Sequence, residues 1–158
     1  MKKAILSTFA ALILFQTAHA TTVTGNASVT IETAITATQT QQMNFGTVTP
    51  ISSIGTVVLS PAGTPTSATL GVYGTAAAGI FDITAQPSTA LTVTFGNGTL
   101  TSGGNTMTVN NFTSTSTPLA NTTDTSGNLT LNVGATLNVG ASQPNGNYAG
   151  TYTVTVSY

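Results

Sequence analysis

Few side chains in this sequence could carry out acid–base, nucleophilic or metal chemistry. The chain has three carboxylates, two lysines, one histidine and no cysteine. The carboxylates are Glu32, Asp82 and Asp124, and they lie far apart in the sequence. A hydrolase needs a nucleophile within hydrogen-bond reach of a base, and a glycosidase needs two neighbouring carboxyl groups. The sequence shows neither pattern, so we expect no catalytic residue and predict that the protein is not an enzyme.

Metal and cofactor sites are equally hard to build from these residues. A chain without cysteine can form neither a thiolate metal site nor a disulfide. The acidic loop at Thr123-Asp124-Thr125 could be considered for calcium, but it lacks the spacing of an EF-hand. No glycine-rich phosphate loop is present. We therefore expect no metal and no cofactor, with the three carboxylates in solvent, and keep a calcium site at Asp124 as the alternative.

The composition excludes several classes of partner and fold. Charged residues make up 3% of the chain, against about 25% in an ordinary soluble domain. A nucleic-acid-binding protein needs lysine and arginine to displace counterions from phosphates, so we expect no nucleic-acid partner. Threonine is the commonest residue, with 36 copies among 158. Threonine and valine are β-branched, and good helix formers are scarce, which favours strands.

The first twenty residues have the pattern of a secretory signal peptide. Lys2 and Lys3 precede an apolar stretch, and Ala18-His19-Ala20 fits the small-x-small rule for cleavage after residue 20. Cleavage would remove both lysines and the histidine, leaving a chain without basic side chains. No later run reaches the roughly 20 apolar residues of a transmembrane helix. We therefore predict an exported protein without a transmembrane segment in its mature chain.

Apolar and polar residues alternate with period two, which predicts strands. Any functional residue must therefore be positioned by strands. Short strands separated by glycine- and asparagine-rich turns predict an all-β fold of the sandwich or barrel type, in one domain. A repeated Leu-Asn-Val-Gly-Ala around Gly134 is read as two strand ends at a glycine corner, and residues 113–128 as a long polar loop. The alternating segments are residues 22–31, 91–95, 107–109, 129–133, 137–139 and 152–158, and the predicted turns are 61–63, 96–98, 103–105 and 144–147.

The segment directly after the predicted cleavage site has an unusual position. The main domain is expected to start near residue 33, which leaves residues 21–32 as an extension with one apolar face. Such a segment can insert beside an open sheet edge of another molecule, and repeated insertion makes a filament. The alternative is that it pairs within its own domain. The residues on its apolar face are Val23, Gly25, Ala27, Val29 and Ile31.

Three motifs in order resemble known bacterial proteins. They are Phe45-Gly-Thr47, Gly134-Ala-Thr-Leu-Asn-Val-Gly140 and Gly146-Asn-Tyr-Ala-Gly-Thr-Tyr-Thr-Val154. Over residues 43–158 the chain looks like an uncharacterised family of secreted bacterial proteins. The motifs around residue 45 and at the end of the chain also resemble subunits of chaperone–usher pili, including the spore-coat-U-like class and the major subunits of fimbriae.

This resemblance implies an immunoglobulin-like β-sandwich that is incomplete and is completed by a donor strand. It implies a structural subunit of a pilus or fimbria on the cell surface, in cell adhesion or biofilm formation. Its partners would be identical subunits, with a periplasmic chaperone and an outer-membrane usher during secretion through the periplasm. The apolar face of the extension would be the donor strand. One wall of the acceptor groove, and the edge used by the chaperone, would be formed by Tyr152, Val154, Val156 and Tyr158.

Two other functions remain open from the sequence. The chain could be a monomeric secreted β-sandwich adhesin that binds glycans through polar loops and tyrosines, with its first strand paired within the domain. It could also be a matrix or coat protein that polymerises in an amyloid-like manner, because neutral threonine-rich strands with exposed edges are prone to cross-β stacking.

Overall fold

The computed structural model describes residues 19–158, and the predicted signal peptide lies outside the described residues except for His19 and Ala20. The chain divides into two units, Met1–Ile31 and Glu32–Tyr158. Residues 19–31 of the first unit are exposed and contain no strand. The strand predicted over residues 22–31 is therefore not formed in the described residues of this unit. An extended segment gains the hydrogen-bond ladder of a strand only when another strand lies beside it.

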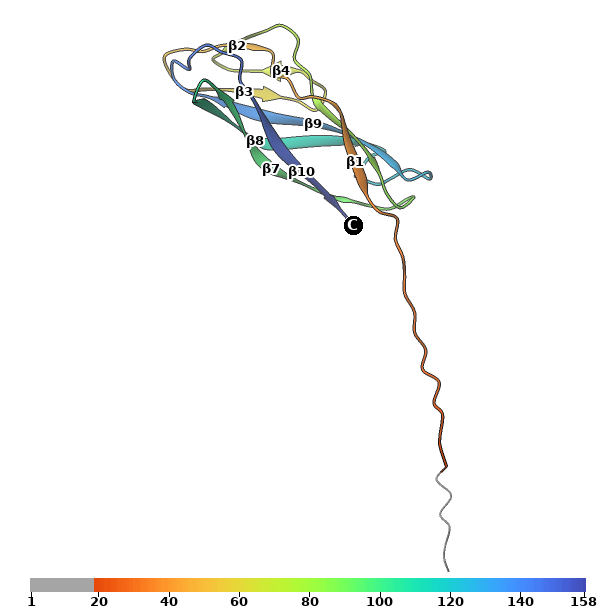
Figure 1. The fold of residues 1–158 in the computed structure, drawn as a ribbon. Helices are drawn as coiled ribbons and strands as arrows, with labels where there is room; N and C mark the ends of the chain where they lie inside the picture. The colour runs from red at the N-terminus through yellow and green to blue at the C-terminus, as the bar shows by residue number, and fades with distance from the viewer. Residues whose placement is uncertain (1–18) are drawn as a thin grey trace, which may run out of the picture. The chain divides into compact units, whose positions relative to one another are not determined.

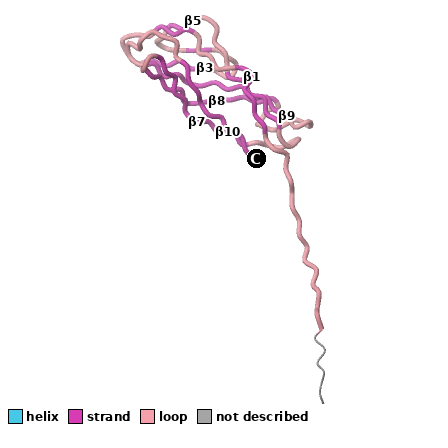
Figure 2. The backbone as a smooth tube through the Cα atoms, in the orientation of Figure 1, coloured by secondary structure: helices cyan, strands magenta, loops and turns pink. Residues whose placement is uncertain are grey.

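The second unit is all-β, as predicted, and residues 32–158 contain strands, turns and bends but no helix (Figures 1 and 2). Accordingly, residues 19–158 hold no helix that is long and apolar enough to cross a membrane. The strands are β1 (Thr36–Gln41), β2 (Thr47–Thr49), β3 (Gly55–Leu59), β4 (Pro65–Thr66), β5 (Gly71–Tyr73), β6 (Gly79–Thr84), β7 (Thr92–Ser102), β8 (Asn105–Thr117), β9 (Asn128–Val139) and β10 (Ala149–Ser157).

Eight of these strands form one sheet in a sandwich-like arrangement (Figure 1). The main path of the sheet is β1-β6-β9-β8-β7-β10, and every pairing along it is antiparallel. Strand β9 is long enough to pair with β6 over its first half and with β3 over its second half. Strands β2 and β5 form a separate two-stranded sheet.

Antiparallel pairing gathers the strand termini at two opposite ends of the sheet. One end, here called the Thr33 end, holds the start of β1, the end of β10, and the loops of residues 85–91 and 118–127. The opposite end, here called the Ile54 end, holds the β7–β8 turn, the end of β9 and the residues before β3. Because β1 and β10 are five antiparallel steps apart, they run in opposite directions.

The core consists of two apolar clusters along β9. Leu137 and Val139, near the Ile54 end, pack with Val57 and Leu59 of β3. The first half of β9 packs against β6 and β7 through Leu129, Leu131 and Val133. Phe112 contacts both clusters and so joins them. The alternate burial of Val57 and Leu59, and of Leu129, Leu131 and Val133, is what the period-two pattern predicted, whereas residues 133–137 of β9 are all buried.

Three local predictions were wrong because long strands continue through residues that usually end them. The predicted turn at residues 96–98 lies inside β7, where the register shifts opposite Thr151 and Thr153. The predicted loop of residues 113–128 begins later, since β8 extends to Thr117. The predicted glycine corner at Gly134 is the middle of a continuous β9. A β-carbon on Gly134 would lie 2.2 Å from the Leu59 carbonyl oxygen, so glycine is needed for close packing of two backbones.

Candidate functional site

A groove of about 300 Å³ lies between the two strands that end the main sheet. Strand β10 contributes Tyr152, Thr153, Val154 and Val156, and strand β1 contributes Ala37 and Gln39. Phe81 and Ile83 of β6 complete the lining. Three of the four residues predicted for one groove wall, Tyr152, Val154 and Val156, therefore lie together along this hollow.

Both strands beside the groove have one free edge. Among the described residues, β1 pairs only with β6, and β10 pairs only with β7. The backbone N–H and C=O groups on their other edges face the groove without a strand partner. Such edges are templates for pairing with another chain unless the protein blocks them. The groove thus offers apolar side chains and two unpaired backbone ladders in one place.

Two aromatic rings of the groove lining, Phe81 and Tyr152, here called its floor, belong to a larger aromatic cluster. The ring of Phe112 lies between those of Phe95 and Tyr152, with centroid distances of 5.4 and 5.1 Å. Phe81 meets Tyr152 edge-on at 6.2 Å. Aromatic pairs in these geometries contribute about 0.5–1.5 kcal/mol beyond the area they bury. The floor is therefore held in place by its own packing, before anything fills the groove.

The hydroxyl group of Tyr152 is buried and has no hydrogen-bond partner in the described chain. It points at Gly79, where an added β-carbon would lie 2.4 Å from the hydroxyl oxygen. Burial raises the pKa of Tyr152 to about 12, because the phenolate would lose its water. The hydroxyl stays protonated in ordinary conditions, so its role in the floor is packing.

Tyr158 was predicted as the fourth residue of the groove wall, and it lies instead at the Thr33 end, outside the groove lining. Its hydroxyl donates a hydrogen bond to the Thr33 carbonyl oxygen and accepts one of 3.0 Å from the Gln86 N–H. Thr33 precedes β1, whereas Tyr158 follows β10. The tyrosine therefore links the two edge strands at this end, because the strand path itself does not.

The predicted donor residues lie in the first unit and are exposed. Val23, Val29 and Ile31 are 84%, 83% and 88% exposed, and Gly25 and Ala27 are exposed as well. Large aliphatic side chains gain about 1.5–3 kcal/mol each when they are fully buried. This segment thus carries exposed apolar surface.

The three carboxylates do not form a site. Asp82 lies on the exposed side of β6 and accepts a hydrogen bond from the Thr130 hydroxyl. Asp124 accepts two backbone N–H bonds of 2.8 Å, from Asn128 and Ser126, and the Asn128 bond contributes most to holding its pKa below the usual value. Within residues 19–158, no three His, Cys, Asp or Glu side chains gather where they could hold a metal.

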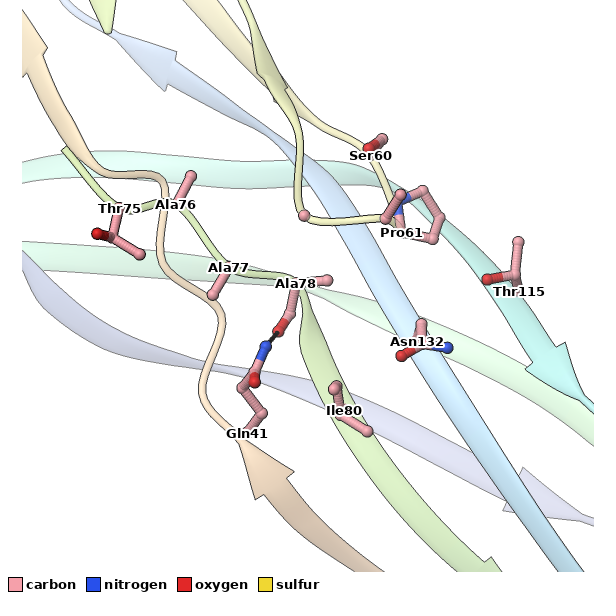
Figure 3. A pocket seen from close by; sticks show the side chains of 12 residues that line it. Gln41, Ser60, Pro61, Thr75, Ala76, Ala77, Ala78, Ile80, Thr115 and Asn132 are labelled. Atoms are coloured by element: carbon pink, nitrogen blue, oxygen red, sulfur yellow. Dashed lines mark hydrogen bonds between the residues drawn. The ribbon is translucent and has the colours of Figure 1, made fainter. Parts of the chain in front are cut away.

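A second hollow, of about 780 Å³, lies over the outer side of β6 (Figure 3). Small and neutral side chains line it, including Ala76, Ala77, Thr115 and Asn132. The side-chain amide of Gln41 donates to the Ala78 carbonyl oxygen at 2.9 Å at its rim. The hollow contains no charged group that could hold an ion, and its polar atoms are hydroxyls and amides.

The sequence reasoning missed half of the groove. Ala37 and Gln39 of β1, and Phe81 and Ile83 of β6, were not named as site residues. The segment of residues 33–41 is rich in threonine and glutamine and has a weak apolar face, so it was not read as an edge strand. Its one usable signal was the alternation of Ile35 and Ala37 with threonines.

Comparisons with known proteins give one relationship. No curated protein and no solved structure matches the chain. A model of the family described as a domain of unknown function, DUF4402, matches residues 35–158. This range holds all ten strands and all the groove residues. The chain therefore belongs to the DUF4402 family.

Proposed function

We propose that the protein is a structural subunit of a bacterial surface filament, a pilus or fimbria that acts in adhesion or biofilm formation. The subunits would be joined by donor-strand exchange: residues 21–31 of one copy fill the groove of the next. The observation that carries this proposal is the apolar groove between β1 and β10, two strands whose facing edges are unpaired.

The extension carries the apolar side chains and the unpaired backbone that could fill the groove. Val23, Val29 and Ile31 would fill the space above Phe81 and Tyr152, and the backbone of the segment would pair with both free edges. Glycine and alanine at positions 25 and 27 keep the middle of the strand narrow. Apolar burial and two ladders of hydrogen bonds together explain how short segments can hold subunits firmly.

Strand direction decides which ends of two subunits meet. A strand between β1 and β10 must run parallel to one and antiparallel to the other, since these two run in opposite directions. If it is parallel to β1, the Thr33 end of the donor domain meets the Ile54 end of the acceptor. Head-to-tail contacts of this kind continue without limit, whereas contacts between like ends stop at two molecules. We therefore propose that the donor runs parallel to β1 and antiparallel to β10.

The subunits would need protection before assembly. A free apolar groove beside two open edges is an aggregation hazard. A periplasmic chaperone and an outer-membrane usher would occupy and then release the groove during export, after cleavage of the signal peptide behind residue 20. The assembled protein would then lie at the cell surface.

The experiment compares lysine substitutions at two neighbouring residues that lie on opposite faces of the donor strand. Val29→Lys would place a charge in the apolar groove, whereas Thr30→Lys places it on the polar face of the same strand. Surface material from expressing cells is examined by negative-stain microscopy and on denaturing gels with and without boiling. Thin fibres and boiling-sensitive multimers are expected from the wild type and Thr30→Lys, but not from Val29→Lys. A soluble wild-type monomer without fibres would overturn the proposal.

A monomeric glycan-binding adhesin is the second candidate, and the hollow over β6 favours it. Its lining combines the hydroxyl or amide side chains of five residues with small apolar surface and carries no charge, which suits neutral sugars (Figure 3). Saturable binding of a neutral glycan by the monomer, lost in Asn132→Leu, would support this function. Binding with no fibres would make it the primary one.

A further inference from the structure

We infer that consecutive subunits also touch end to end, with Leu119 of one subunit packing against Ile54 of the next. This inference rests on the proposed function and adds a second interface to it. The partner is a second copy of this chain, and the contact joins the Thr33 end of one domain to the Ile54 end of its neighbour.

The first step is the shortness of the connection between groove and domain. Thr33 is fixed to its own domain, because its carbonyl oxygen accepts the Tyr158 hydroxyl and its backbone N–H and hydroxyl donate to Gln86 at 3.3 and 3.0 Å. Ile31 is the last apolar residue of the donor face. Only Glu32 separates them, and two residue steps span at most about 7 Å. A donor seated as far as Ile31 therefore brings the two domain ends into contact.

The second step concerns where the donor segment leaves its own domain and where it enters the next one. The donor leaves its own domain beside β1 and the end of β10, where Tyr158 joins these strands. It would enter the acceptor at the Ile54 end beside the start of β10, where Ala149 pairs with Thr101. Strand β1 flanks only the farther half of this path, since its last paired residue, Gln41, lies opposite Ile80. The two domains thus stack with equivalent strands above one another. The loop between β8 and β9 of one subunit then lies over the end of β9 in the next.

The third step is the apolar surface that stacking would bury. Leu119, in the β8–β9 loop, is 79% exposed. Ile54 is also 79% exposed, and the next residue, Gly55, pairs with Val139 at the end of β9. Each side chain lies in water in the single chain, and each lies at the end that stacking would cover.

The loop that presents Leu119 is held firmly. The Asn121 N–H donates to the Ser116 hydroxyl at 2.9 Å, and the Leu91 N–H donates to the Asn121 carbonyl oxygen at 2.8 Å. Ala120 and Asn121 adopt left-handed backbone conformations that fix the turn. A fixed apolar residue loses little conformational freedom on contact, which favours association.

Charge does not oppose this contact. The Thr33 end carries two of the three carboxylates of residues 19–158, Glu32 and Asp124. The Ile54 end is formed by residues 42–54, 102–106 and 140–148, which contain no charged side chain. The acidic end therefore meets a neutral one, and like charges are not brought together.

The test uses the absence of cysteine from the sequence. Filaments of the double variant Leu119→Cys/Ile54→Cys are treated with a short bis-maleimide, then boiled in detergent to dissociate the donor strands. A covalent ladder of three or more subunits is expected. The matched control is Leu119→Cys/Val58→Cys: Val58 is also exposed but lies within β3, on the flank of the sheet, so it should give no ladder.

A second variant separates this inference from the proposed function. Insertion of Gly-Ser-Gly-Ser between Glu32 and Thr33 lets the donor strand fill the groove while the domain ends move apart. Boiling-sensitive multimers should persist, and the ladder from the 119/54 pair should be lost. Multimers without any 119/54 ladder in the uninterrupted chain would overturn the end contact alone. Absence of multimers from the wild type would overturn both.

Discussion

The Tyr158 hydroxyl donates a hydrogen bond to the carbonyl oxygen of Thr33, across 125 residues of sequence. This contact joins the end of β10 to the start of β1, two strands that do not pair with each other. It ties the two strands beside the groove together at the Thr33 end and fixes the point at which the N-terminal segment leaves the domain.

Tyr158→Phe should therefore lower the free energy of unfolding by about 0.5–1.5 kcal/mol, the usual net value of a hydrogen bond. The ring remains, but the Thr33 carbonyl and the Gln86 N–H lose their partner. Urea denaturation of residues 32–158 measures the change. Tyr73→Phe is the matched control, because that hydroxyl makes no hydrogen bond in the described chain. Equal stability of the two variants would contradict the role of the contact.

Gly134→Ala should be among the most damaging single-methyl changes in the chain. Its β-carbon would meet three backbone atoms of residues 59–61 at 2.2, 2.6 and 2.8 Å, and backbone cannot move aside as a side chain can. Overpacking of this kind costs about 1–3 kcal/mol or more. Gly96→Ala, also within a long strand, is the control, since its nearest contact would be 3.4 Å. Thermal unfolding of both variants checks the difference.

These two glycines show how far the sequence could predict the fold. Alternation in segments such as residues 129–133 and 152–158 predicted the all-β class, the buried face of β9 and the half-buried face of β10, because period two is set by strand geometry itself. Glycine at 96–98 and at 134 was read as a turn or corner. Whether a glycine ends a strand or admits a neighbouring backbone depends on a contact with distant residues, here Leu59 and Thr153, which local sequence does not encode.

Only the β10 side of the groove could be predicted from the sequence. Tyr152, Val154 and Val156 alternate with threonines and are half-buried, so their pattern was visible. The facing strand β1 is exposed at every position, because nothing covers its groove side in the single chain. A strand whose apolar partner belongs to another molecule carries a weak signal in its own sequence. Its place across the groove from β10 follows from the shared groove lining and the Tyr158–Thr33 hydrogen bond, which bring together the two ends of the sheet path.

Alkaline pH should weaken the fold through Tyr152. Burial raises its pKa to about 12 from the ordinary value of 10.0, so the unfolded chain releases this proton at lower pH than the folded chain does. The stabilisation is fully present below pH 10 and is lost as pH rises from about 10 to 12. Denaturation series between pH 9 and 12 measure the slope. In Tyr152→Phe the slope should be smaller, and an unchanged slope would contradict burial of this hydroxyl.

Acid should loosen the loop at Asp124. The backbone N–H of Asn128, with that of Ser126, holds the pKa of this carboxyl below 3.8. The contribution is present above the unfolded pKa and is lost as pH falls through the lower folded value. NMR titration of the carboxyl and hydrogen exchange of the Ser126 and Asn128 amides follow the change. Asp124→Ala should expose both amides at neutral pH, and protection equal to that of the wild type would contradict the assignment.

A synthetic peptide of residues 21–31 should stabilise a domain that lacks this segment. A ligand that binds only the folded state raises the free energy of unfolding by about 2.7 kcal/mol at a hundredfold excess over its Kd. The groove supplies two free strand edges and the apolar side chains of Phe81, Ile83 and Val154 for such binding. The melting temperature of residues 32–158 should therefore rise with peptide concentration.

The same peptide with Val29→Lys should have no effect, whereas Thr30→Lys should act like the wild type, because only the first charge would face the groove. If both lysine peptides raised the melting temperature equally, binding would not depend on the apolar face. Residues 23, 25, 27, 29 and 31 would then no longer be the groove-filling set.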